Sequence, residues 1–191
     1  MQVPDMKFCT QCGASLDRRI PPGDNLPRHV CPNCGEIHYL NPKIIVGCVA
    51  EWEGRLLLCR RAIEPRLGRW TLPAGFMEVG ETTAHAAHRE TLEEAGADVH
   101  IDALFAVVNV PHIDQVHLFY RGRLRTPQHA PGEESLSVEL LEEAAIPWDD
   151  LAFRSVELCL RAYLKDRAQG AFGLHEAELG PLPAFDPNTA Y

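Results

Sequence analysis

The sequence has no apolar run long enough to cross a membrane. The longest candidate among its 191 residues is Ile44 to Ala50, whereas a membrane-spanning helix needs roughly 20 apolar residues. The segment from Met1 to Thr10 also lacks the apolar core of a secretory signal peptide, which argues against secretion by that route. Internal repeats and low-complexity tracts are absent too. We therefore expect a cytoplasmic protein that does not enter a membrane.

Positive charge is scarce as well. The chain has 18 Lys and Arg residues against 27 Asp and Glu residues, a formal charge of −9. This balance argues against broad binding to nucleic acids or anionic membranes, because both attract positive patches. With 46% hydrophobic residues, the chain is long enough for one main globular domain and one small module. An anionic ligand would need bound metal ions or local cations, and the candidate cations are Arg60, Arg61, Arg66 and Arg69.

Four of the seven cysteines form two Cys-Xaa-Xaa-Cys pairs, Cys9 with Cys12 and Cys31 with Cys34. A glycine follows each pair, as in the tight turns of a zinc ribbon, so the spacing predicts a closed, tetrahedral Zn²⁺ site of structural type. Two alternatives stay open. In the first, the four cysteines form redox or disulfide pairs, which the missing signal peptide disfavours. In the second, His29 or His38 replaces one cysteine ligand. The other three cysteines stand in apolar surroundings and are expected to be buried thiols: Cys48, Cys59 and Cys159.

A group of carboxylates is predicted on one helix. The alanine-rich segment Thr83 to Ala95 has no internal Gly or Pro, and Gly96 follows it as a helix-ending glycine. Glu90, Glu93 and Glu94 then lie within about two turns of one helix face. Such a group repels itself unless oxygen-binding ions such as Mg²⁺ or Mn²⁺ neutralise it. The alternative is a charged helix face that only contacts solvent.

The spacing around this helix resembles the signature of the Nudix hydrolases. The residues that occupy its fixed positions are Gly75, Glu81, Arg89, Glu90, Glu93, Glu94 and Gly96. Thr91 and Ala97 stand where the pattern usually has bulky aliphatic residues, and Ala74 replaces a glycine that often precedes Gly75. These departures remove no carboxylate. Residues 75–97 are called the Nudix box below.

The resemblance implies roles for the box residues. Glu90 and Glu94 would be the main ligands of Mg²⁺ or Mn²⁺, with the Gly75 carbonyl as a backbone ligand. Glu93 would be a further ligand or a charge held by Arg89, which precedes it by four residues. Glu81 would contact the metal shell. The general base is either a box glutamate or a carboxylate outside the box, for which the acidic loop offers Glu133 and, as our candidate, Glu134.

The order of expected elements indicates an α/β protein. Strands are expected at 44–52, 55–59, 99–110, 116–124 and 137–141, a strand leads through residues 69–75 into the box, and a second helix is expected at about 155–168. By resemblance this is the Nudix α/β/α sandwich with a mixed sheet, preceded by a small zinc-ribbon β module. We expect the ribbon at residues 1–41, with a loop at 18–25, the hydrolase domain at 42–180 and a loosely ordered tail at 181–191.

A narrower resemblance covers most of the chain. A zinc ribbon joined to a Nudix domain through Asn-Pro-Lys, with Cys-Arg-Arg-Ala-Ile-Glu-Pro at 59–65, Gly-Glu-Glu-Ser at 132–135 and Ile-Pro-Trp-Asp at 146–149, is similar to bacterial relatives of plant FAD and ADP-ribose pyrophosphatases. For the remainder of such a substrate, Arg60, Arg61 and Arg69 are candidates to bind phosphate, and Phe76 or Trp70 to stack on a ring. Trp70 is equally expected in the core.

The expected activity is therefore metal-dependent hydrolysis of a nucleoside diphosphate-linked compound, first of all FAD or ADP-ribose, to two monophosphates. One alternative is an NADH or NAD-capped RNA pyrophosphatase, although the motif that distinguishes that group is not found downstream of the box. The other is a non-catalytic module whose ribbon contacts RNA or protein. The expected partner is a small nucleotide substrate, nucleic acid is not expected, and the family implies a homodimer.

Overall fold

A computed structural model describes residues 6–181. Almost all of the predicted tail at 181–191 therefore lies outside the described residues. The chain divides into two compact units, Met1–Pro42 and Lys43–Tyr191, and the predicted division after residue 41 differs from this one by one residue. In residues 6–181, no helix is both long and apolar enough to span a membrane.

The first unit is built on a small antiparallel sheet. Its strands are β1 (Asp17–Arg19), β2 (Arg28–Val30) and β3 (Ile37–His38), in the order β1-β2-β3. The loop predicted at 18–25 therefore begins too early, because Arg18 and Arg19 belong to β1 and pair with β2. Few apolar side chains are buried in residues 6–42: Cys9, Pro21, Val30 and Cys31. A unit with so small a core needs another source of stability.

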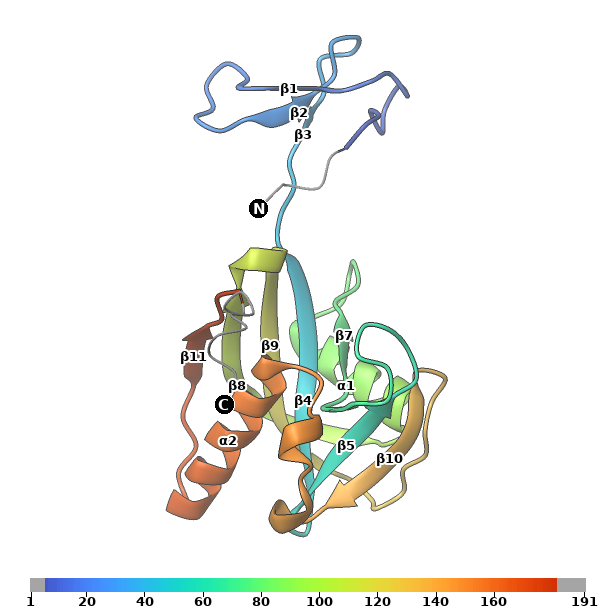
Figure 1. The fold of residues 1–191 in the computed structure, drawn as a ribbon, viewed down its shortest axis with the longest axis vertical. Coiled ribbons are helices and arrows are strands. Elements are labelled where there is room, and N and C mark those ends of the chain that lie inside the picture. The colour runs from blue at the N-terminus through green and yellow to red at the C-terminus, as the bar shows by residue number, and fades with distance from the viewer. Residues whose placement is uncertain (1–5, 182–191) are drawn as a thin grey trace, which may run out of the picture. The chain divides into compact units, whose positions relative to one another are not determined.

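The second unit contains one mixed sheet of eight strands (Figure 1). Six form a continuous path in the order β10-β5-β4-β9-β8-β11, while β6 pairs with β5 and β7 pairs with β4. The pairs β4–β9 and β8–β11 are parallel and the others are antiparallel. The strands are β4 (Lys43–Trp52), β5 (Arg55–Arg61), β6 (Trp70–Thr71), β7 (Ala74–Phe76), β8 (Val99–Val110), β9 (Gln115–Leu124), β10 (Ser135–Leu141) and β11 (His175–Glu178).

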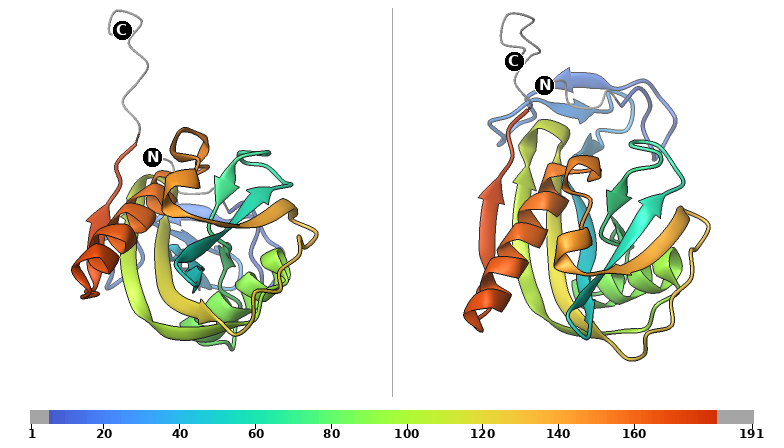
Figure 2. Two further views of the ribbon diagram at one scale, coloured as in Figure 1. Left: turned by 90° about the horizontal axis from the view of Figure 1, so that it is seen from below. Right: turned by 60° about the horizontal axis from the view of Figure 1, so that its bottom comes forward.

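Two helices, α1 (Thr83–Ala95) and α2 (Arg154–Gln169), cover opposite faces of this sheet (Figure 2). Successive strand residues point to opposite faces, and β4 accordingly supplies two hydrophobic clusters. Val46 and Cys48 pack with the alanines of α1, whereas Val49 packs with Leu160 and other apolar residues of α2. Three short 3₁₀ helices complete the unit: η1 (Pro111–Ile113), η2 (Glu143–Ala145) and η3 (Trp148–Asp150). The predicted α/β sandwich with a mixed sheet, preceded by a small β module, is confirmed.

Local signals in the sequence locate the box helix well. The Thr82 side chain accepts a hydrogen bond from the His85 N–H at the start of α1, and Gly96 ends the helix with a φ of 57°. The bounds predicted for this helix and for the 99–110 strand are confirmed to the residue. Strand β11 was not predicted, because its four residues, His-Glu-Ala-Glu, carry no apolar run. The burial expected of three cysteines is confirmed for Cys48, Cys59 and Cys159.

Candidate active site

The four paired cysteines of the first unit converge. Their sulfur atoms all lie within 4.8 Å of one another. The nearest contacts join the two knuckles, at 3.6 Å between the Sγ atoms of Cys9 and Cys34 and 3.5 Å between those of Cys12 and Cys31. These distances are far above the roughly 2.05 Å of a disulfide bond, and all four thiols are free. Among the described residues, no histidine belongs to the group.

Hydrogen bonds from backbone N–H groups to these sulfurs favour the thiolate form, which binds a cation. The Gln11 N–H donates to Cys9 Sγ and the Cys34 N–H donates to Cys31 Sγ, both at 3.4 Å. The backbone at Ala14, followed by the side chain of Asn33, lowers the pKa of Cys12 to about 6 by hydrogen bonding, which favours its thiolate. Four converging sulfurs with such donors fit a structural Zn²⁺ ion.

In the second unit, Glu90 lies directly against β7. A Cβ atom on Gly75 would overlap the Glu90 carboxylate, so only a glycine allows the side chain to rest on the strand. The pairing of β7 with β4, where Gly75 is opposite Val46, fixes the position of this strand. Glu90 is buried, and burial raises the pKa of its carboxyl. The Gly75 backbone and the Glu90 carboxylate are therefore neighbours.

Glu94, one helical turn further along α1, lies against the same strand. Its Oε2 atom accepts a hydrogen bond of 3.1 Å from the Ala74 N–H. It is 7% exposed, and burial raises its carboxyl pKa to about 8. The negative charge of Glu90 adds to this shift. Two buried carboxyls with raised pKa values form a site that a bound cation would stabilise in its ionised form.

Arg89 joins one carboxylate of this pair to two further carboxylates. Its guanidinium donates to Glu81 at 2.7 and 3.0 Å, to Glu90 at 2.7 Å and to Glu93 at 3.0 Å. It also donates to the Phe76 carbonyl at 3.2 Å. This arginine lowers the pKa of Glu81 to about 2 and holds Glu81 as an anion. Arg89 therefore ties the loop before α1 to the helix.

Glu93 is placed differently from the other two helix glutamates. Its side chain is 58% exposed and pairs with Arg89. Among the described residues, the three box glutamates do not form a group of metal-ligand distances like that of the cysteines. The expectation that three carboxylates share one small volume is met in part. Glu90 and Glu94 lie buried against β7, and Glu93, although exposed, is held near Glu90 because the same Arg89 nitrogen donates to both. The implied pairing of Arg89 with Glu93 is present.

The acidic loop before β10 passes over the end of α1. The Gly132 N–H donates to the Glu94 carbonyl at 3.1 Å and the Ala130 N–H to the Ala95 carbonyl at 2.8 Å. A Cβ atom on Gly132 would overlap the Glu93 carbonyl oxygen. The loop brings the charge of Glu134 close enough to raise the pKa values of Glu90 and Glu94. Glu134 therefore lies close enough to the carboxylate pair to act on it electrostatically.

The three candidate arginines, Arg60, Arg61 and Arg69, have different neighbours. Arg61 lies near the carboxylate pair, since its charge lowers the pKa of Glu94, and its guanidinium lies 5.1 Å from the ring centre of Phe153. Arg60 donates to the Gly68 carbonyl at 2.8 Å. Arg69 donates to the Asp149 carbonyl at 3.4 Å. Arg61 also donates to the Pro65 carbonyl at 2.8 Å, so its charge near Glu94 is what distinguishes it from the other two.

The two candidate aromatic residues, Phe76 and Trp70, also differ in their exposure and neighbours. Phe76 is 52% exposed, follows Gly75 on β7, and has the Lys43 ammonium 5.2 Å from its ring centre. Trp70 packs against the hydrophobic cluster under α2. The exposed ring of Phe76 is therefore accessible to the ring of a ligand. Trp70 instead packs against the core, which was the other expectation for it. The partnership of Lys43 with Phe76 was not predicted, because 33 residues separate them in the sequence.

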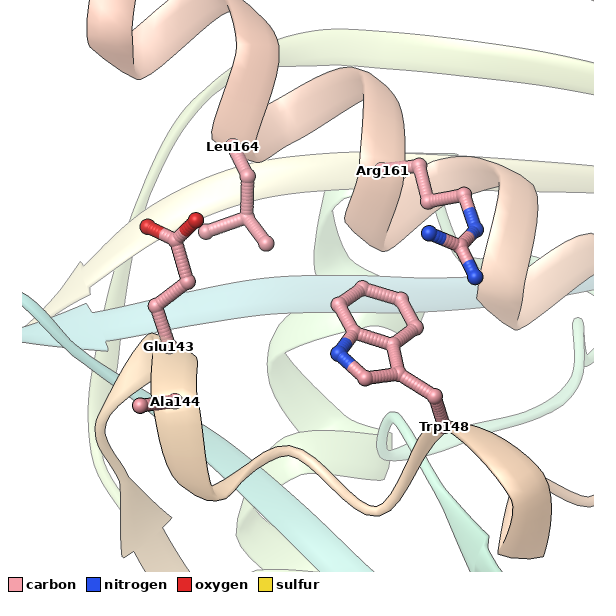
Figure 3. A pocket seen from close by; sticks show the side chains of 5 residues that line it. All are labelled: Glu143, Ala144, Trp148, Arg161 and Leu164. Carbon is pink, nitrogen blue, oxygen red and sulfur yellow. The ribbon is translucent and has the colours of Figure 1, made fainter.

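A cavity of ≈570 Å³ lies elsewhere on the second unit (Figure 3). Trp148 and Arg161 face each other across it, with the guanidinium 4.3 Å from the ring centre. Glu143, Ala144 and Leu164 complete the lining. No residue of the Nudix box lines this cavity, so the candidate site rests on the box geometry.

Comparison with known proteins agrees with this organisation. Residues 7–40 match the family model described as Nudix N-terminal, a zinc ribbon, and residues 41–166 match that of the NUDIX domain. A solved structure of a NUDIX hydrolase from Nitrosomonas europaea is 52% identical, with a TM-score of 0.90, and the match covers 92% of this chain and 100% of the other.

Two curated relatives carry more specific names. The NAD-capped RNA hydrolase NudC of Chromobacterium violaceum is 38% identical over 95 residues, which are 49% of this chain and 33% of the relative. An ADP-ribose pyrophosphatase of Methanocaldococcus jannaschii is 37% identical over 76 residues, or 40% of this chain and 45% of the relative. The matched segments thus span less than half the length of these relatives.

Proposed function

Because this chain belongs to the Nudix family, we propose that it hydrolyses the diphosphate bond of a nucleoside diphosphate-linked compound in a reaction that depends on Mg²⁺ or Mn²⁺. FAD and ADP-ribose are the first candidate substrates, and the products are two monophosphates. The observation that carries the proposal is the pair Glu90 and Glu94, buried side by side against β7 beside the backbone of Gly75. A pair of buried carboxyls without a nearby cation would destabilise its own charged form.

The donor set fits a divalent metal that prefers oxygen ligands. Glu90, Glu94 and the Gly75 carbonyl would hold it, with Glu93 available from the Arg89 ion pair. When bound, Mg²⁺ or Mn²⁺ offsets the charge of the diphosphate and makes a bound water more acidic. Arg89 keeps Glu81, Glu90 and Glu93 in fixed positions by hydrogen bonds. The charge of Arg61 near Glu94 favours an anionic substrate at the same place.

Glu134 is our candidate for the general base. Its charge acts on both Glu90 and Glu94, which places a carboxylate outside the helix close to them. Replacement of Glu134 by Gln should lower kcat by about 10²-fold or more with little change in KM. The neighbouring Glu133→Gln is the matched control and should retain kcat. Full kcat in both variants would remove this loop from catalysis.

For the rest of the substrate, Phe76 is the candidate to stack on an aromatic ring, and Arg61 is the first of the three arginines to bind phosphate. Phe76→Ala should raise KM for FAD and ADP-ribose more than it lowers kcat. Trp70 is not included, because it packs in the core. Arg60 and Arg69 are weaker candidates. All three arginines donate to a backbone carbonyl, and what favours Arg61 is the effect of its charge on Glu94.

A second candidate function is hydrolysis of NADH or of NAD-capped RNA. It is favoured by the likeness to an NAD-capped RNA hydrolase over half of this chain. A third, non-catalytic reading makes the protein a binding module with a zinc ribbon. Turnover of FAD, ADP-ribose, NADH and diadenosine polyphosphates with Mg²⁺ or Mn²⁺ separates the three. Turnover of NADH alone would favour the second function, and no turnover of any compound would leave only the third.

We also propose that the four cysteines bind one structural Zn²⁺ ion, that the protein acts in the cytoplasm and that it forms a homodimer. Metal analysis of the purified protein tests the first point, with one zinc per chain expected. Light scattering tests the dimer, for which a particle of about twice 21.3 kDa is expected. A particle of 21.3 kDa would refute it.

A further inference from the structure

Three nitrogen-bearing side chains form a row across the small sheet of the first unit. Arg18 on β1 is the cross-strand partner of His29 on β2, and His29 is the partner of His38 on β3. Residues directly opposite each other in antiparallel strands project from the same face of the sheet. All three side chains therefore lie side by side on one face.

This row lines a small cavity of ≈170 Å³. The other lining residues are Leu26, Pro27, Arg28 and Leu40, so no carboxylate lines it. The neighbouring acid, Asp24, is already used: it accepts hydrogen bonds from the Arg28 side chain at 2.8 Å and from the Leu26 N–H at 3.1 Å. The cavity thus has two guanidinium groups and two imidazoles in its wall, with one of the guanidinium groups paired.

His38 carries an unsatisfied hydrogen-bonding atom. Its Nε2 is buried and is the only such side-chain nitrogen or oxygen without a hydrogen-bond partner in residues 6–181. A buried polar atom without a partner destabilises a fold, so such atoms are rare and call for a reason. When Nε2 carries the ring proton, a small rotation of the ring toward a ligand oxygen would satisfy it.

The first unit has much less net negative charge than the second, which favours the binding of an anion there. Residues 1–42 contain four Lys or Arg and four Asp or Glu, and residues 43–191 contain 14 and 23, so the formal charge of −9 belongs entirely to the second unit. Four thiolates with a bound Zn²⁺ would add a charge of −2 to the first unit, which is still far less negative than the second. The guanidinium groups of Arg18 and Arg28 are the permanent cations at the cavity.

From these observations we propose that the first unit binds a phosphate group in the cavity formed by Arg18, His29 and His38. A phosphate group has several acceptor oxygens, which suit the planar donor fork of an arginine and the N–H of an imidazole. The cavity is of the size of a phosphate group rather than of a whole nucleotide. This site is separate from the Nudix box and does not depend on the proposed hydrolysis.

The test is a titration of the full-length, zinc-loaded protein with inorganic phosphate at constant ionic strength and without Mg²⁺ or Mn²⁺. Nitrogen-15 NMR of the histidine rings is expected to show a saturable change at His38. Arg18→Ala should weaken binding about tenfold, as expected for the loss of a charge-assisted hydrogen bond. Arg19→Ala is the matched control: it removes the same charge one residue away, on the opposite face of β1, and should change the affinity less than twofold.

Two further arms complete the test. In His38→Phe, the ring signal of His29, which lines the same cavity, should lose its saturable response to phosphate while the protein retains zinc and a dispersed NMR spectrum. AMP and a short RNA without terminal phosphates then distinguish a phosphate monoester from a phosphodiester chain as the source of the group, and competition by either with inorganic phosphate supports the proposal. A ring signal of His38 that does not saturate, or an equal loss of affinity in Arg18→Ala and Arg19→Ala, would overturn it.

Discussion

The two units hold their reactive groups by opposite means. In the first, the cysteines come from two knuckles, and few apolar residues of its described part, 6–42, are buried: Cys9, Pro21, Val30 and Cys31. In the second, Glu90 and Glu94 project from a helix whose alanines are already packed in a large core. A cation in the first unit therefore contributes to folding. A cation in the second would be bound by a fold that exists without it.

The largest expected effect is the unfolding of the first unit when a chelator removes its zinc. Removal of zinc, or the substitution Cys31→Ser, should unfold residues 7–40 completely, because the remaining core cannot offset the loss of chain entropy. Residues 43–181 should keep their fold. Two-dimensional NMR checks this: the ribbon signals should collapse to unfolded positions while those of the second unit stay dispersed. Loss of both sets of signals would show that the two units are not independent.

The next effect concerns the second unit alone. Glu94→Gln should lower kcat by about 10³-fold, since it removes a main metal ligand. It should leave the thermal stability of the metal-free protein unchanged or higher, because burial disfavours the charged form of this carboxyl. Steady-state kinetics and calorimetry measure the two quantities. Glu93→Gln, on the exposed side of the helix, is the control and should cost only about tenfold. A larger loss for Glu93→Gln than for Glu94→Gln would contradict the arrangement.

A smaller effect is expected from the loop that brings Glu134 to the site. Gly132→Ala places a methyl group on the Glu93 carbonyl oxygen, so the loop must move and take Glu134 with it. We expect kcat to fall by about 10-fold to 10²-fold. Gly173→Ala, where the added methyl group meets open space, should leave kcat unchanged. Unaltered kcat in Gly132→Ala would mean that the position of this loop does not matter for the reaction.

The smallest effect tests a departure from the family pattern. Thr91 is fully buried and its hydroxyl donates to the Ala87 carbonyl at 2.7 Å, inside the helix. Thr91→Val keeps the shape and restores an aliphatic side chain. It removes one buried hydrogen bond and should change the free energy of unfolding by about 1 kcal/mol, since the Ala87 carbonyl keeps its place in the helical ladder. Denaturant unfolding measures it, and a loss of several kcal/mol would show that the hydroxyl is required.

Local patterns in the sequence were sufficient for much of this structure. The alanine-rich run that ends at Gly96 predicts α1, and the continuous apolar run from Ile44 to Ala50 predicts a strand, whose residues 46–50 are buried in β4. The cysteine spacing likewise predicted two knuckles. In each case the signal lies within a few residues of the feature that it predicts.

Features that depend on distant pairings were not predictable in this way. The alignment of β5 with β10 and the path of the loop over α1 decide that Arg61, rather than Arg60, and Glu134, rather than Glu133, act on the carboxylate pair. Neighbouring residues of the same type are equivalent in a sequence until the sheet places them on different faces.

The central claim is that Glu90 and Glu94 support attack of water on a diphosphate. The most direct measurement is hydrolysis of ADP-ribose and of FAD in ¹⁸O-labelled water with Mg²⁺, followed by mass spectrometry of the products, for the wild-type protein and for Glu94→Gln. The account predicts two monophosphates, one of which carries a single ¹⁸O atom, and almost no product from the variant. Monophosphates without the label, or equal rates for the two proteins, would contradict it.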